Sequence, residues 1–179
     1  EDPEALTEAV STIYHEYVKR VYRYCYTRVG NAADAEDLTS QIFTQVLENL
    51  SQYRHRGHFA AWLFTIAHRR VVDHYRRSRD EVSLEASGDA LGELWSGPQA
   101  DPLRQTLRSE TRQHLIELIK SLQDKDRELL RLRFAADLTY REMAQVLGRT
   151  EGAVKMATHR LLRRLQAKWE EENNGQSNR

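Results

Sequence analysis

Two stretches of the sequence concentrate arginine, whose side chain binds phosphates and the edges of bases. Between Arg54 and Arg79 the chain carries seven arginines and a single acidic residue, Asp73, which gives this stretch a net charge of about +6. Between Arg149 and Lys168 the excess of positive charge is about +5. Guanidinium groups form bidentate hydrogen bonds with phosphate and with guanine. The chemistry that these stretches predict is binding of nucleic acid.

The second basic stretch follows a pattern that is typical of a helix-turn-helix. Thr139 and Glu142 have the spacing of a capping box, which begins a helix. Gly148 is suited to the left-handed residue that ends a helix, and Thr150 is suited to cap the next one. The pattern therefore predicts a short helix, a tight turn and a second helix, which in such motifs enters the major groove of DNA.

One face of this second helix is apolar, so the opposite face is available to DNA. Val154, Leu161 and Leu165 recur at helical spacing and are expected to point inward. On the other face we expect Arg160 to pair with a guanine. The residues expected to contact duplex DNA are Arg149, Thr150, Lys155, Met156, His159, Arg160 and Arg163. This segment alone leaves open an ordinary helical hairpin with a solvated basic face.

Apolar residues recur at intervals of three and four along most of the chain, which predicts an all-α fold. The spacing predicts a first helix that ends near Gly30, a second from Asn31 to about Leu50, and a third from Phe59 to about Arg79. Four more helices, including the helix-turn-helix pair, are expected in the C-terminal part. The inward-facing residues are expected to include Tyr14 and Phe134.

Between these helical parts lies an acidic segment with poor periodicity. From Asp80 to Asp101 the chain has no Lys or Arg, and it contains glycine and proline. We expect two small helical domains, residues 1–79 and 111–179, joined by an acidic flexible linker, residues 80–110.

Composition limits the other classes of protein. The chain has 179 residues with 27 basic and 27 acidic side chains, so the DNA-binding charge is local rather than global. A single cysteine, Cys25, provides no disulfide framework. No apolar stretch reaches the roughly 20 residues that span a bilayer, and no signal peptide is evident. A cytoplasmic protein without membrane insertion is expected.

An enzyme is the least favoured reading. His68, Asp73 and His74 are possible metal ligands, but the two histidines are six residues apart and lie on different faces of one helix. There is no Gly-rich phosphate loop and no pair of catalytic carboxylates. We therefore expect no catalytic residue, metal or cofactor.

Three segments, in order, resemble those of bacterial RNA polymerase sigma factors of the extracytoplasmic-function (ECF) group of the sigma-70 family. Residues 34–43 are similar to the family's conserved segment in domain two, and residues 59–70 are similar to its promoter-melting helix. Residues 129–133 with the helix-turn-helix resemble domain four. The chain departs from the family at Arg69, where Asn is usual, and at Gln123, where Pro is frequent.

The resemblance implies a sigma factor that binds core RNA polymerase, recognises promoter DNA and catalyses nothing itself. It implies that the second helix docks on the beta-prime clamp helices, that domain four holds the beta flap, and that an anti-sigma factor keeps the protein inactive. The residues expected to bind core polymerase are Asp34, Asp37, Gln41, Gln45 and Glu48.

The resemblance also places recognition of the melted minus-ten element on the N-terminal basic stretch. Aromatic rings stack on unpaired bases, and cations hold the backbone. The residues expected to do so are Tyr53, Arg54, His55, Arg56, Phe59, Trp62, Arg69, Arg70, Asp73, His74, Arg76 and Arg77. For Trp62, a place in the core is favoured over a wedge against the DNA.

A second function remains open: a conventional helix-turn-helix regulator that binds a duplex operator without polymerase. In that case the N-terminal domain senses a signal or dimerises. This alternative leaves the Arg-rich helix and its aromatic loop without a role.

Overall fold

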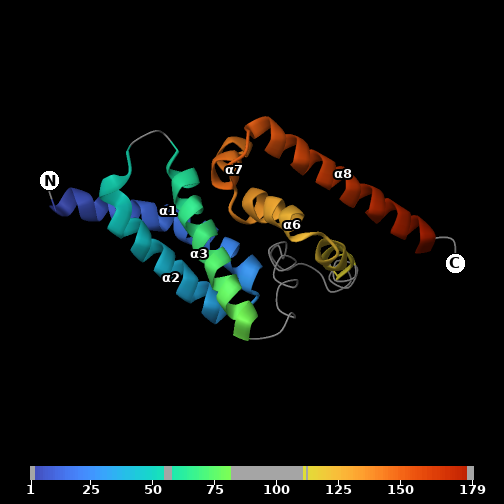
Figure 1. Ribbon diagram of the computed structural model, residues 1–179, viewed down its shortest axis with the longest axis horizontal. Coiled ribbons are helices and arrows are strands. Elements are labelled where there is room, and N and C mark those ends of the chain that lie inside the picture. The colour runs from blue at the N-terminus through green and yellow to red at the C-terminus, as the bar shows by residue number, and fades with distance from the viewer. Residues whose placement is uncertain (1–2, 55–57, 82–110, 112, 177–179) are drawn as a thin grey trace, which may run out of the picture.

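A computed structural model describes residues 3–54, 58–81, 111 and 113–176, and within these ranges every regular element is helical. The elements are α1 (Pro3–Val29), α2 (Ala32–Asn49), the short η1 (Leu50–Gln52), α3 (Phe59–Glu81), a helix over residues 113–120, α6 (Asp124–Leu130), η2 (Arg131–Ala135), α7 (Tyr140–Leu147) and α8 (Glu151–Gln176) (Figure 1). The all-α prediction is confirmed. Most of the expected linker lies outside the described residues.

Helices α1, α2 and α3 pack against one another and form what we call the N-terminal lobe. Its core includes Val21, Leu38, Ile42 and Phe64, all nearly inaccessible to solvent. The side chain of Asn31 accepts a hydrogen bond from the backbone N–H of Asp34 at 2.8 Å, so it begins α2 as predicted.

The helix-turn-helix is formed by α7 and α8, in the C-terminal lobe of residues 113–176. The capping box is present, because Thr139 accepts from the Glu142 N–H while the Glu142 carboxylate accepts from the Thr139 N–H at 2.8 Å. Gly148 ends α7 with φ of 62°. Thr150 caps α8 by accepting from the Ala153 N–H. These three local predictions are confirmed.

Two expected core residues are instead exposed. Tyr14 is 46% exposed, because it lies on the rim between α1 and α2 and packs edge-on against Phe43. Phe134 is 41% exposed and belongs to η2, a π-helix in which the Ala136 N–H bonds to the Arg131 carbonyl. The wider turn of a π-helix moves Phe134 off the face that α-helical spacing predicts.

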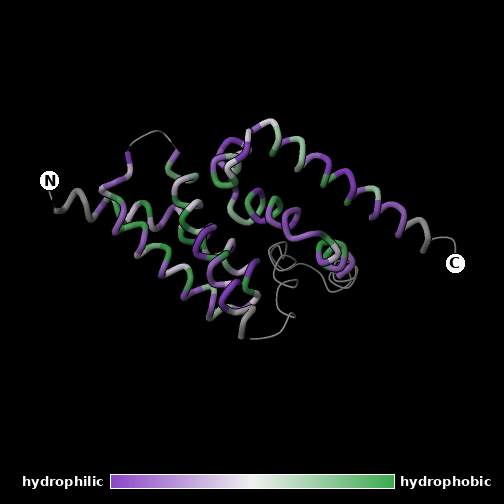
Figure 2. The backbone as a smooth tube through the Cα atoms, viewed as in Figure 1, coloured by the Kyte–Doolittle hydropathy of each residue, from purple (hydrophilic) through white to green (hydrophobic). Residues whose placement is uncertain are grey.

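The two lobes are in contact. Helix α7 lies against α3 (Figure 1). The short η2 lies against α1. One continuous apolar core includes Phe64 of the N-terminal lobe and Met143 of the C-terminal lobe. Arg20 of α1 donates hydrogen bonds to the carbonyls of Ala136 and Asp137 at 2.8 and 2.9 Å. Along α8, which packs against α6 and α7, hydrophilic residues predominate (Figure 2).

Two glycines of the helix-turn-helix give a stability prediction. A Cβ at Gly148 would meet nothing within 4 Å, so Gly148→Ala is penalised only by the left-handed backbone, which costs about 1 kcal/mol. Gly152 lies in the first turn of α8, also in open space. Gly152→Ala should therefore stabilise the protein, by roughly 0.5 kcal/mol. Urea unfolding followed by circular dichroism measures both changes.

Each variant is the control for the other, because each adds one methyl group at an exposed glycine, and the two glycines are four residues apart. Changes of the same sign in the free energy of unfolding would contradict the left-handed conformation at Gly148.

Candidate nucleic-acid interface

The outward face of α8 gathers the residues predicted to contact duplex DNA. Val154 and Leu161 are fully buried and fix the orientation of the helix. The opposite side presents a set of exposed residues: Arg149, Thr150, Lys155, Met156, His159, Arg160 and Arg163. Met156 is 57% exposed although apolar, and its carbonyl accepts a hydrogen bond from the guanidinium of Arg160. The structure thus brings the whole predicted set to one surface.

A concave basic surface lies beside this face. A groove of about 770 Å³ is lined by Arg149, Arg160 and Arg163 from the turn and α8, and by Lys125 of α6. Arg164, at its edge, is paired with Asp126 at 2.8 Å. Positive charge around a hollow suits a phosphate backbone, because the field there is focused on an approaching anion.

On α3, the predicted residues divide into two groups. Arg69, Asp73, Arg76 and Arg77 are exposed. Arg70 is instead held by α2, because its guanidinium donates to the Gln45 side chain at 2.8 Å.

His74, which is partly buried, lies 4.0 Å from the Asp34 carboxylate. The α2 residues Gln45 and Asp34 therefore orient two of the predicted DNA-binding side chains. Arg54 is exposed, whereas His55 and Arg56 lie outside the described residues.

Three aromatic rings form a cluster at the start of α3. The ring centroids of Tyr53, Phe59 and Trp62 are 5.0 to 5.5 Å apart. Trp62 is partly buried and packs against the core while part of its surface stays accessible. Trp62 therefore lies at the edge of the core and not, as expected, fully inside it. The rings are tilted to one another by 39° to 88°, and each keeps part of its surface accessible, as a ring that stacks on an unpaired base must.

Helix α2 presents the predicted polymerase-binding residues. Asp34, Asp37, Gln41 and Glu48 are exposed, and Gln45 is partly buried against α3. The Gln41 amide donates to the Asp37 carboxylate at 2.6 Å, which aligns these two side chains on one surface.

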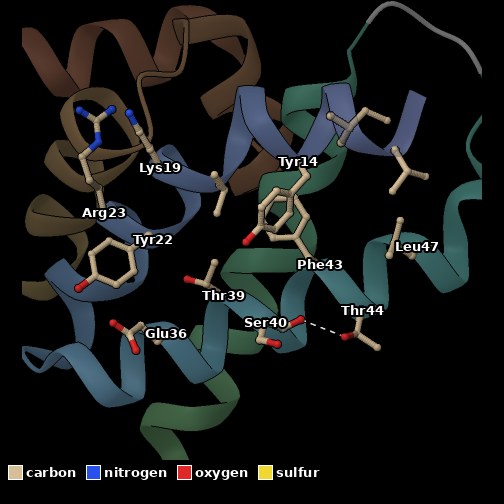
Figure 3. Close-up of a pocket in the computed structure, with 13 residues that line it drawn as sticks. Tyr14, Lys19, Tyr22, Arg23, Glu36, Thr39, Ser40, Phe43, Thr44 and Leu47 are labelled. Atoms are coloured by element: carbon tan, nitrogen blue, oxygen red, sulfur yellow. Dashed lines mark hydrogen bonds between the residues drawn. The ribbon is translucent and has the colours of Figure 1, made fainter. Parts of the chain in front are cut away.

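Between α1 and α2 lies an apolar groove of about 690 Å³ that the sequence analysis missed (Figure 3). At one end it is lined by Tyr14, Phe43 and Leu47, and at the other by Lys19 and Arg23. Helical periodicity assigned Tyr14 to the core, so no pattern in the sequence indicated an open groove there.

The sequence analysis also missed a cluster of polar and charged groups, centred on the buried Glu128 of α6. Glu128 Oε1 accepts a hydrogen bond from the Tyr24 hydroxyl at 2.6 Å and lies 3.0 Å from Nδ1 of His68. Its other carboxylate oxygen lies 3.3 Å from the Arg131 guanidinium. Arg28 donates to the Asp124 carboxylate at 2.7 Å. We call these residues the ionic cluster: Tyr24, Arg28, His68, Asp124, Glu128 and Arg131.

The neighbours of Glu128 keep it ionised. Burial alone would raise the pKa of Glu128, but the hydrogen bond from His68, the charge of Arg131 and the hydrogen bond from Tyr24 outweigh it and lower the pKa to about 2. Burial, and then the charge of Glu128, raise the pKa of Tyr24. At neutral pH the cluster therefore combines a carboxylate acceptor with a neutral hydroxyl donor.

Two other features bear on function. Within the described residues, no group of three His, Cys, Asp or Glu side chains is placed to hold a metal ion. In the same part of the chain, none of the helices has the length and hydropathy needed to cross a bilayer.

Comparison with known proteins places these features in a family. The sigma-70 region 2 family matches residues 13–81, and sigma-70 region 4 matches residues 112–165. The chain is 35% identical over 161 residues to the ECF RNA polymerase sigma factor BldN of Streptomyces coelicolor, covering 88% of this chain and 59% of that protein. It is 34% identical over 169 residues to the ECF sigma factor SigD of Mycobacterium tuberculosis, covering 92% of this chain and 76% of that protein.

Two solved structures share the fold. CnrH in complex with the cytosolic domain of CnrY superposes with a TM-score of 0.63 at 18% identity, over 92% of this chain and 89% of that chain. RpoE in complex with the anti-sigma factor NepR, from Bartonella quintana, gives a TM-score of 0.64 at 19% identity, over 89% and 96%.

The fold and the two regional matches define a helical transcription initiation factor of the sigma-70 type. More specifically, the chain belongs to the ECF group of RNA polymerase sigma factors. The resemblance seen in the sequence is thereby confirmed, and a conventional regulator is not favoured.

Proposed function

We propose that this chain binds core RNA polymerase and directs it to promoters through two separate DNA-reading surfaces. Residues 1–79 would recognise the minus-ten element as a melted non-template strand, residues 111–179 would read the minus-thirty-five element as a duplex, and residues 80–110 would link them. The observation that carries the proposal is that exposed basic faces occur on both α3 and α8 of one sigma-family chain. In this account the polymerase performs the chemistry and the chain acts in the cytoplasm.

Reading of the upstream element rests on the outward face of α8. A helix of this kind fits the major groove, where Arg160 would pair with a guanine and Lys155 would contact a base edge or phosphate. The basic groove beside α8 would follow the backbone, so binding should weaken as salt rises.

Recognition of the downstream element rests on α3 and the aromatic cluster. A protein melts DNA by binding unpaired bases more tightly than paired ones. Stacking on Tyr53 or Trp62 would contribute roughly 1 to 3 kcal/mol per base. The exposed guanidinium groups of Arg69, Arg76 and Arg77 would hold the phosphates.

Binding of polymerase rests on both lobes. The exposed polar stripe of α2 offers acceptors to basic groups of the beta-prime clamp helices. In the C-terminal lobe, a smaller apolar groove of about 260 Å³ is lined by Leu115, Phe134, Leu162 and Trp169, and it would receive the beta flap.

The groove between α1 and α2 suits an amphipathic helix of an anti-sigma factor. Tyr14, Phe43 and Leu47 would take the bulky apolar side chains of such a helix. Lys19 and Arg23 at the other end would meet a carboxylate, which fixes the direction of the helix (Figure 3). A helix held there would also crowd the polymerase-binding stripe on the same α2.

Charge reversal on α2 tests the polymerase interface. In the double variant Asp37→Lys, Gln41→Lys the acceptors are replaced by cations, so affinity for core polymerase should fall at least a hundredfold, because like charges are opposed. Both side chains are exposed, so helicity should be retained. Fluorescence titration with core polymerase measures the affinity, and far-UV circular dichroism the helicity.

Glu171→Lys, an equally exposed charge reversal on α8, is the control and should bind normally. Unchanged affinity in the α2 double variant would remove this stripe from the interface.

Loss of two cations on α8 tests the division between the lobes. Lys155→Ala with Arg160→Ala should weaken recognition of the upstream element by roughly 2 to 4 kcal/mol, because a base contact and a neighbouring contact are lost. Melting of the downstream element, followed by permanganate footprinting on a preassembled complex, should be unchanged.

Lys19→Ala with Arg23→Ala removes the same two positive charges from the groove between α1 and α2 and should leave upstream recognition intact. Parallel losses in upstream binding and downstream melting would contradict separate reading surfaces.

A further inference from the structure

Two glutamines one turn apart on α2 make different contacts. The Gln41 amide is exposed and donates to the Asp37 carboxylate of the same helix at 2.6 Å. Gln45 is partly buried, and its side-chain oxygen accepts a hydrogen bond from Nε of Arg70 on α3 at 2.8 Å. Spacing along the sequence groups Gln45 with Gln41 as a polymerase contact, yet in the structure its side chain is turned toward the arginine-rich helix.

Apolar packing fixes both ends of this hydrogen bond. Val46, next to Gln45, and Val71, next to Arg70, are almost completely buried, and α2 packs against α3. The register of the two helices therefore depends on the core and not on the hydrogen bond. A change of the Gln45 side chain should leave both helix backbones in place, so the contact can be tested by itself.

Only part of the Arg70 guanidinium is engaged. An arginine side chain carries five N–H donors, and within the described part of the chain the Nε donor of Arg70 alone is bonded. The two Nη groups are not among the buried donors that lack a partner, so they are accessible to solvent. Side by side, they form a fork that matches two oxygens of a phosphate.

The bond to Gln45 limits how Arg70 can bind an anion. A free guanidinium can hold a phosphate through both Nη groups or through Nε and one Nη, whereas Arg70 keeps only the first arrangement. The bond also restricts the rotamers of a long side chain, so less freedom remains to be lost on binding. The neighbouring Arg69 is exposed and has no such contact among the described residues, so a ligand would have to order it.

We infer that Gln45 is a positioning residue for promoter binding, which holds Arg70 so that its two Nη groups are presented to a phosphate of the unpaired strand. The phosphate as ligand rests on the proposed function, whereas the hold on Arg70 does not. The polymerase contact on α2 then falls to exposed side chains such as Asp37 and Gln41. Because a phosphate contact carries no sequence information, Gln45 adds to affinity and not to the choice of promoter.

The first test is hydrogen exchange at Nε–H of Arg70 in the free chain, followed by nitrogen-15 NMR. Gln45→Met keeps the length of the side chain and removes the acceptor, so exchange should accelerate by roughly fivefold or more. Gln45→Glu retains an acceptor oxygen and should keep this proton protected. Gln145→Met, the same change at an exposed residue of α7, is the matched control and should leave exchange at Arg70 unchanged.

Three results would overturn the inference: unchanged exchange in folded Gln45→Met, equal acceleration in Gln145→Met, or loss of protection in Gln45→Glu. Gln45→Ala also removes the acceptor, so it gives the same reading if Gln45→Met folds poorly.

The second test is binding of single-stranded DNA to the complex of this chain with core polymerase. The probe is a short fluorescein-labelled oligonucleotide of random sequence, and binding to core alone is subtracted. Gln45→Met should weaken binding by about threefold to tenfold, because one orienting hydrogen bond is lost. The dependence of affinity on salt should stay as in the parent protein, because no charge is removed. Arg70→Met should instead reduce the slope of log affinity against log salt by about 0.7.

A double-mutant cycle separates positioning from a general effect on the fold. In the Arg70→Met background, Gln45→Met should have no further effect on affinity, because no guanidinium remains to be held. In the Arg69→Met background, where the neighbouring exposed arginine is removed instead, Gln45→Met should keep its full effect. An equal effect of Gln45→Met with and without Arg70 would overturn the inference.

The two tests distinguish this inference from the proposed function. If the complex with core binds the strand no better than core alone, the proposed reading of the melted strand is contradicted, and the role of Arg70 toward phosphate fails with it. Exchange at Arg70 in the free chain still decides whether Gln45 holds its side chain.

Discussion

A single carboxylate organises the contact between the two halves of this protein. Glu128 is buried, yet it remains ionised because a tyrosine hydroxyl, a histidine and an arginine converge on it. Its partners come from both lobes, so the orientation of α6 relative to α1 and α3 follows from satisfying this one group. That orientation brings α7 onto α3 and leaves the basic side of α8 facing solvent. The exposed surfaces proposed to bind DNA and polymerase are those that this packing does not use.

Local signals in the sequence predicted the helix-turn-helix well, whereas long-range contacts were not predictable. The capping box at Thr139, the left-handed Gly148 and the cap at Thr150 act over three or four residues, and all are found in the structure. The ionic cluster joins residues 104 and 60 positions apart, so no pattern within a helix indicates it. Tyr14 and Phe134 were misplaced for a related reason: periodicity identifies an apolar stripe but not where the neighbouring helix ends or where a π-turn shifts the register.

The charge distribution explains how a chain of zero net charge serves as a DNA-binding protein. Exposed basic side chains are concentrated on α3 and on the turn and outward face of α8, while α2 presents the acidic side chains of Asp34, Asp37 and Glu48, where polymerase is proposed to bind. Some of the predicted residues have a second role that the sequence did not reveal, since Gln45 holds Arg70 and Asp34 lies near His74. The α2 stripe therefore orients part of the helix that is proposed to face DNA, in addition to its proposed role in binding polymerase.

The most direct test of the account is transcription by core RNA polymerase from a pool of randomised promoters, with and without this protein. We predict that the protein binds core and enriches promoters with two conserved blocks at a fixed spacing, one for each lobe. Failure to bind a matched core polymerase, together with selection of a single duplex site by the protein alone, would contradict it and would indicate a conventional DNA-binding regulator.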